Sequence, residues 1–366
     1  MTKSKGSTTP PFVRPYAPSW VDRVLEELDR LPGPAWLAFL ALGAVGVVVQ
    51  LAIQFSSGDY QPGSFLPLHI WTMASYAYLL AMIFYLDKAA ASAAKAFRPV
   101  LRTAHPESPS DAPMMSFDEL RYQMTTLPPG PALWAAVLGA LGLGLAPLLV
   151  IGRTLTAALV MFDLPTQPLP MTAALIHIIL TQAVAGVLIF HTVHQLRLIH
   201  HVYLHHADIN LYRLPPLYAF SIPTAMTAGG LLVYNYIFFA VSPFLRQQPV
   251  GQALGVFFSL IAIITFVWPL WGAHRRLVQE KKKLLQKSSA RFEATVARLH
   301  DGLDRKRLSG MDELNKALGS LELEQAALRR IPTWPWEPGT VRGVTVAVVL
   351  PIILWLIQTL LEKMLA

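Results

Sequence analysis

The sequence predicts an all-α, polytopic membrane protein with seven transmembrane helices, and three observations lead to this fold class. The composition is the first: 54% of the 366 residues are hydrophobic and 14% are charged, whereas soluble domains carry about 25% charged residues. The second is a set of seven apolar runs, each close to the roughly 20 residues that a helix needs to cross a bilayer. These runs cover residues 36–53, 65–85, 133–151, 171–190, 222–241, 253–271 and 344–361.

The third observation is the uneven placement of lysine and arginine. When the segments between the seven runs are assigned alternately to two sides, 27 of the 30 cationic residues fall on the side of the N-terminus and 3 on the other. Because cationic loops stay in the cytoplasm, we expect the N-terminus inside and the C-terminus outside. Topology then accounts for the net charge of +8, so we expect no nucleic-acid partner.

Residues 1–32 form the first predicted unit, a cytoplasmic tail with an amphipathic helix. The tail up to Pro18 is polar and rich in proline, and it lacks the apolar core and small-residue cleavage site of a signal peptide. Ser19 is a suitable N-cap, and the apolar residues of 20–31 fall on one face of the helix that follows it. That face lies either on the membrane surface or against the protein's own cytoplasmic part.

Residues 33–272 make up the second unit, which holds the first six spans and their loops. The loop 87–126 opens as an alanine-rich helical continuation, and Ser116 begins a short helix with a capping-box pattern. No Asp, Glu, Lys or Arg falls within the runs as drawn, which argues against a proton-driven pump because such pumps relay protons through ionisable residues inside the membrane. The glycines of 139–144 indicate close helix packing in the third span.

The fourth and sixth spans are predicted to continue as helices into the cytoplasm. The fourth runs on to Ala207, and the sixth leads into the third unit, residues 273–340, which we expect to form a helical hairpin and then an elbow rich in tryptophan and proline. Gly310 breaks the hairpin, and Pro332 ends its second helix. The two helices carry an apolar seam made of Phe292, Val296, Leu299, Leu303, Leu314, Leu318, Leu321 and Leu328.

Histidine is concentrated in the fourth span and its extension, where seven of the eleven histidines lie. His194, His201 and His205 fall on one helical stripe, a spacing typical of two-histidine metal ligation. Together with Asp208 they could hold zinc, or they could titrate together as a pH sensor. The third interpretation is that these imidazoles simply meet water and anionic headgroups. The chain has no cysteine, so thiolate ligands and disulfides are excluded.

The last unit, residues 341–366, holds the seventh span. Trp355, Gln358 and Glu362 share one helical face near the predicted external end, with Thr359 beside them and Leu354 about one turn deeper. This face is either the lining of a pore, with an apolar gate and a polar mouth, or a helix end that meets water.

The order of elements resembles that of the insect chemoreceptor-like seven-helix ion channels. In that family helix extensions build a cytoplasmic anchor, and the last helix of four subunits lines the pore. The resemblance implies a homotetramer with a kink at Pro351 and pore-facing positions at Trp355, Gln358 and Thr359. Leu354 and Glu362 are added as pore positions from the helical face described above. The phrases at residues 125–128, 216–221 and 331–340 also look like an uncharacterised bacterial multi-pass family, which implies an integral protein of the bacterial cytoplasmic (inner) membrane.

Three functions follow from these patterns. The first is a homo-oligomeric ion channel or channel-like receptor, and the second is a membrane sensor or scaffold that binds a cytoplasmic protein partner through the hairpin. The third is a transporter or metal-handling protein that uses the histidine stripe. The sequence holds no Gly-x-Ser-x-Gly elbow and no His-Glu-x-x-His motif, so we expect neither an enzyme nor a cofactor. Membrane lipids are expected partners in each case.

Overall fold

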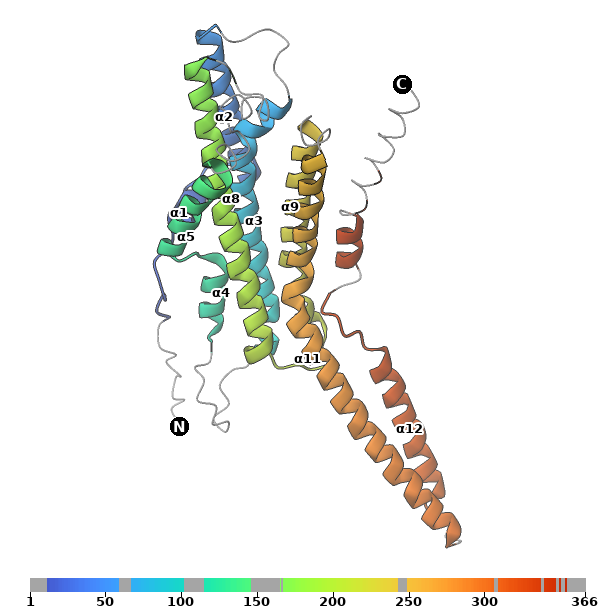
Figure 1. Ribbon diagram of the computed structural model, residues 1–366. Coiled ribbons are helices and arrows are strands. Elements are labelled where there is room, and N and C mark those ends of the chain that lie inside the picture. The colour runs from blue at the N-terminus through green and yellow to red at the C-terminus, as the bar shows by residue number, and fades with distance from the viewer. Residues whose placement is uncertain are drawn as a thin grey trace, which may run out of the picture.

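The computed structural model describes residues 12–58, 67–101, 115–145, 165, 167–242, 249–305, 309–336, 339–346, 349 and 353. Helices make up most of these residues (Figure 1), and the strand-like pairing within them is one bridge between Leu101 and Ala207. The α-helices are α1 Trp20–Asp29, α2 Ala35–Ser56, α3 Pro67–Phe97, α4 Phe117–Thr125, α5 Pro129–Leu138, α8 Pro168–His201, α9 Ser221–Val241, α11 Pro249–Asp304 and α12 Met311–Arg330. Shorter turns are η1 Arg98–Val100, η2 Gly139–Leu145, η3 Val202–His206 and η4 Pro215–Tyr218.

Six helical segments of the described chain are long and apolar enough to cross a membrane. They are Ala35–Ser56, Pro67–Val100, Phe117–Leu145, Pro168–His206, Pro215–Val241 and Gly251–Asp304. The all-α, multi-pass architecture that the sequence predicts is therefore confirmed in its first six spans. Most of the seventh run, 344–361, lies outside the described residues, so the count of seven and the sides on which the two termini lie stay predictions.

Helix α3 lies at the centre of the bundle, where it packs against α2, α8 and α9. Glycines permit the closest approach in the bundle, between the end of α5 and α8. A Cβ atom placed on Gly186 would lie 2.8 Å from the Cα atom of Gly139 and closer still to the Ala135 carbonyl oxygen. Ordinary side chains cannot fit there, which confirms the predicted small-residue packing at Gly139. Gly142 has no atom within 4 Å of its Cβ position, so the prediction does not hold for that glycine.

Helix α1 begins with the cap that the sequence predicts. The Ser19 side chain accepts a hydrogen bond from the Asp22 N–H, and the Asp22 side chain accepts one from the Ser19 N–H, which completes a capping box. Val21 and Leu25 are buried in the same apolar core as Leu86 of α3. Of the two predicted placements, α1 therefore adopts the one in which its apolar face packs on the protein itself.

The two long extensions are confirmed as helices. Helix α8 and its π-helical end η3 run from Pro168 to His206. Helix α11 is a single helix of 56 residues, about 84 Å long at 1.5 Å per residue, although it contains Pro269. Helix α12 runs back beside its far end after a turn in which Gly310 has φ 86°.

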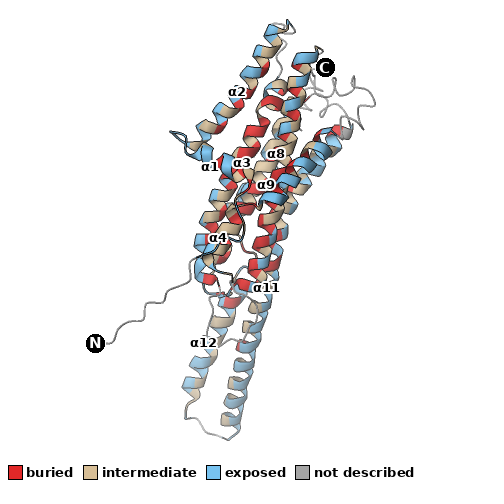
Figure 2. Cartoon of the chain, turned by 90° about the vertical axis from the view of Figure 1, so that its left-hand side faces the viewer, coloured by how far each residue is buried: buried red, intermediate tan, exposed pale blue. Residues whose placement is uncertain are grey.

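The α11–α12 hairpin projects from the bundle, and exposed residues cover most of it (Figure 2). Leu328 is buried in the pair, and the other predicted seam residues are half-buried except at the tip. Leu303 is 52% exposed, so its place in the seam was wrong. Helix α11 ends at Asp304, one residue later, and α12 begins at Met311.

Candidate functional site: a buried carboxylate–imidazole network

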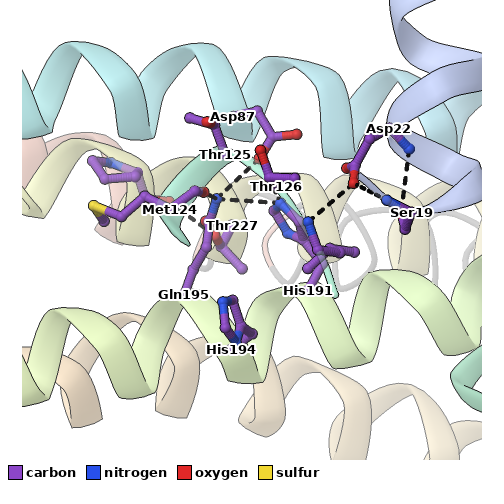
Figure 3. A network of polar contacts seen from close by, with 12 residues as sticks. Ser19, Asp22, Asp87, Met124, Thr125, Thr126, His191, His194, Gln195 and Thr227 are labelled. Carbon is purple, nitrogen blue, oxygen red and sulfur yellow. Dashed lines mark hydrogen bonds and ion pairs between the residues drawn. The ribbon is translucent and has the colours of Figure 1, made fainter. Parts of the chain in front are cut away.

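Polar side chains from α1, α3 and α8 meet inside the bundle (Figure 3). The His191 side chain, from α8, is 1% exposed, and its Nε2 lies 2.8 Å from Oδ1 of Asp87, on α3. The Asp87 carboxylate is itself only 16% exposed. One turn further along α8, Gln195 donates from Nε2 to the same oxygen of Asp87 at 3.2 Å and to the Met124 carbonyl at 2.8 Å. The network therefore joins two helices through one carboxylate.

Asp22 supplies a second carboxylate from α1. Its Oδ2 accepts hydrogen bonds from the backbone N–H of Ser19 at 2.7 Å and of Leu127 at 3.0 Å. Burial raises the pKa of the Asp22 carboxyl, while the bonds from Ser19 and Leu127 and the charge of His191 act in the opposite direction and are smaller. Asp22 thus caps its own helix and also fastens that helix to the segment that leads into α5.

The charges in this network do not balance. Two carboxyl groups face one imidazole, and among the residues that the structure describes the buried Nδ1 of His191 has no hydrogen-bond partner. A buried polar atom without a partner costs stability, and a buried carboxylate requires a nearby positive charge or hydrogen bonds. Burial raises the pKa of the Asp22 carboxyl, so this carboxyl keeps its proton to a higher pH than an exposed aspartate does.

A second set of hydrogen bonds lies beside this network and joins α8, α4 and the segment before α1. His194 Nε2 lies 3.0 Å from the Gln123 carbonyl oxygen of α4. Tyr16 donates from its hydroxyl to the Thr126 carbonyl at 2.9 Å, and the Tyr122 hydroxyl donates to the Tyr16 carbonyl at 2.6 Å. Burial raises the pKa of Tyr16, so its hydroxyl stays protonated and keeps donating. Movement of α1 or α4 would break these bonds.

Asp87 lies where the predicted second span passes into its helical continuation. The structure confirms this continuation, because Asp87 lies inside α3, ten residues before that helix ends, and the alanine-rich stretch 88–97 packs against other helices. The sequence analysis did not predict that these helices enclose the carboxylate. The sequence signal was present: a predicted helical continuation of small residues keeps a packed face, so its first carboxylate is enclosed.

The predicted histidine stripe is divided in the structure. The His201 and His205 rings are neighbours, with centroids 4.7 Å apart, whereas His194 contacts α4. The backbone N–H of Asp208 donates to the Val100 carbonyl at 2.7 Å. Within the described residues no group of three or more His, Cys, Asp or Glu side chains is placed to hold a metal ion. Zinc binding or pH sensing by these four residues stays a prediction.

The predicted pore positions cannot be placed. Leu354, Trp355, Gln358, Thr359 and Glu362 all lie outside the described residues.

The network is connected to the hairpin through contacts between α8 and α11. A Cβ atom on Gly272 of α11 would lie 2.8 Å from the His200 ring of α8, so the two helices touch at this point. One turn further, Arg276 donates from Nη1 to the carbonyl oxygens of Tyr203 at 3.2 Å and of Leu204 at 2.5 Å. These carbonyls belong to the π-helical end of α8, so Arg276 binds the end of the helix that carries His191.

Comparison with known proteins adds no relative. No family model matches the chain, and no curated protein or solved structure is similar to it.

Proposed function

We propose that this chain is a membrane sensor without enzymatic activity, which binds a cytoplasmic protein partner through the α11–α12 hairpin. In this proposal the buried network is the input and binds a proton. The observation that carries the proposal is the continuity of α11. A single helix of 56 residues includes both the contact with α8 and one half of the hairpin.

The input is supported by where the ionisable groups lie. Ionisable side chains buried together are candidates for function because their burial is costly and shifts their pKa values. Asp22, Asp87 and His191 face one another, and His194 and Tyr16 border them. A change of one proton alters the balance of charge that holds α1, α3 and α8 together.

The contacts between α8 and α11 support the transmission of a movement from the network to the hairpin. His191 and His200 lie nine residues apart on α8, about 14 Å at 1.5 Å per residue. Because the His200 ring lies against Gly272 and Arg276 binds the carbonyl oxygens of Tyr203 and Leu204, we expect a shift of α8 to move α11. The hairpin is an extension of α11, so its tip would move further than its base.

The output is supported by the exposure of the hairpin. Leu323 of α12 is 74% exposed, a large apolar side chain among charged neighbours. Nearer the tip of the hairpin, Lys316 and Asp312 pair across one turn of the same helix at 2.6 Å. A partner that covers Leu323 would bury apolar surface, the usual centre of a protein interface.

Spin-label distances test this function. The chain has no cysteine, so Glu27→Cys on α1 and Ala297→Cys on the hairpin give two unique labels at exposed positions. We expect the distance between them to shift between pH 5 and pH 8 in a bilayer, and the shift to vanish in His191→Gln. His300→Gln, which removes an exposed imidazole from α11, is the matched control and should keep it. A shift that persists in His191→Gln would refute the proposal.

The homo-oligomeric channel is the alternative function, and it rests on the order of elements. In that proposal the hairpin anchors the subunits and the last span lines the pore. Conductance that changes in Leu354→Ala and Gln358→Ala, in a particle of four subunits, would support it. A monomer by mass photometry with no conductance would remove it.

A further inference from the structure

The segment 331–336, which follows α12, folds back onto α11. Lys281 donates from Nζ to the carbonyl oxygens of Arg329 at 2.7 Å and Ile331 at 2.8 Å, where a cation balances the dipole at the end of α12. His274 Nδ1 lies 3.0 Å from the Thr333 carbonyl oxygen. The elbow is therefore fixed to α11 at two points seven residues apart.

Four aromatic rings stack along this contact. Trp336 stacks on Phe266 and on Trp334, with ring centroids 5.4 and 4.3 Å apart, and His274 stacks on Trp334 at 4.1 Å. The ring planes of each pair lie within 16° of parallel. Indole rings collect where the bilayer meets water, and the apolar run of α11 ends here, at Trp271. We therefore expect the lipid headgroups at the level of this ring column.

A groove of about 490 Å³ opens beside the elbow on the next turns of α11. Val278 and Leu285 give it an apolar wall, and Lys281, Lys282 and Thr333 also line it. The acidic lining residue, Glu293, lies eleven residues beyond Lys282 on α11. The groove thus combines positive charge with apolar surface at one level.

Arg275 and Lys282 are exposed cationic side chains on the turns of α11 that follow Trp271. They are seven residues apart on α11 and so share one face. The Arg275 guanidinium lies 6.0 Å from the centre of the Trp271 ring. Side chains lean towards the N-terminus of their helix, and on α11 that direction leads back to the membrane. The lysine stem can therefore bring its ammonium group to the headgroups while its apolar part stays on the protein.

We propose that an anionic phospholipid binds to α11 at the end of this groove nearer the ring column, with Lys282 of the groove and Arg275, two turns earlier on the same face, holding its headgroup phosphate. The acyl chains lie along the exposed apolar face of α11, where Ile264 and Trp268 are 54% and 60% exposed. A lipid is favoured over an acidic protein segment because the two cations adjoin the ring column and this apolar face. The site is independent of the proton-binding network.

Native mass spectrometry of the full chain tests the site. The protein is released from nanodiscs that contain equal amounts of phosphatidylglycerol and phosphatidylcholine, and the retained ratio of the two lipids is measured. Each cation near an anionic headgroup contributes about fivefold to binding, so Arg275→Gln with Lys282→Gln should lower the ratio about 30-fold. Arg291→Gln with Arg298→Gln, at exposed sites further along α11, removes the same charge beyond the Debye length of about 8 Å and should leave the ratio unchanged.

Three results would overturn the site: a wild-type chain that does not enrich phosphatidylglycerol, an equal loss in both double variants, or displacement of the lipid by soluble glycerol phosphate. Lys282→Gln alone should lower the ratio about fivefold and serves if the double variant unfolds.

Discussion

The pair of His191 and Asp87 should be strongly coupled in a double-mutant cycle. Asp87→Ala removes the acceptor of two hydrogen bonds, from His191 at 2.8 Å and from Gln195 at 3.2 Å. The side chains of His191 and Asp87 are 1% and 16% exposed, so water screens their interaction little. Breaking one partner of a buried ion pair costs about 3–5 kcal/mol, whereas neutral hydrogen bonds inside membrane bundles average about 0.6 kcal/mol in such cycles. We expect a coupling energy of about 1.5–2 kcal/mol, between these limits.

The assay is the free energy of unfolding of the wild type, Asp87→Ala, His191→Ala and the double variant in bicelles at pH 7. The matched control is the cycle for Lys88 and Asp29, which pair at 3.0 Å but are 53% and 47% exposed. An exposed pair contributes under about 1 kcal/mol. If the two single changes at the buried site add to within about 0.5 kcal/mol, as independent sites do, the reasoning about this network is wrong.

Three further predictions concern other parts of the chain. Gly186→Ala should lower the free energy of unfolding by about 2–3 kcal/mol because the added Cβ has no space against α5. Gly142→Ala is the control and should change the free energy of unfolding little, since no atom lies within 4 Å of its Cβ position. Chemical unfolding measures both variants. Burial raises the pKa of Asp22 in the folded state, so the protonated carboxyl favours folding in acid. This contribution to the free energy of unfolding is lost as the pH rises from about 3.9, the pKa in the unfolded chain, through the raised pKa of the folded state. Thermal unfolding of Asp22→Asn should lack that fall in stability. Trp336→Ala removes two stacked pairs of about 0.5–1.5 kcal/mol each and should speed hydrogen exchange in the elbow, measured by mass spectrometry.

Local signals in the sequence predicted the individual elements well. Ser19 and Ser116 each cap the helix that follows, and Gly310 turns the hairpin as expected because glycine adopts positive φ at little cost. The apolar runs also located the first six spans. Each of these features depends on residues that are close together in the chain.

The candidate site depended on contacts that no local pattern contains. His191 and Asp87 are 104 residues apart, and only the packing of α3 on α8 brings them together. The sequence showed that His191 lies close to the histidine stripe, but the face on which Asp87 lies is set by the continuation of α3. The same holds for α1, whose amphipathic pattern fits a membrane surface as well as a protein surface.

The double role of Asp22 sets an order for biogenesis. Its carboxylate completes the first turn of α1 and also binds the Leu127 N–H, 105 residues later. Because a ribosome makes the chain from its N-terminus, the second partner emerges long after the helix. Helix α1 therefore reaches its final position only after the first two predicted spans have been made.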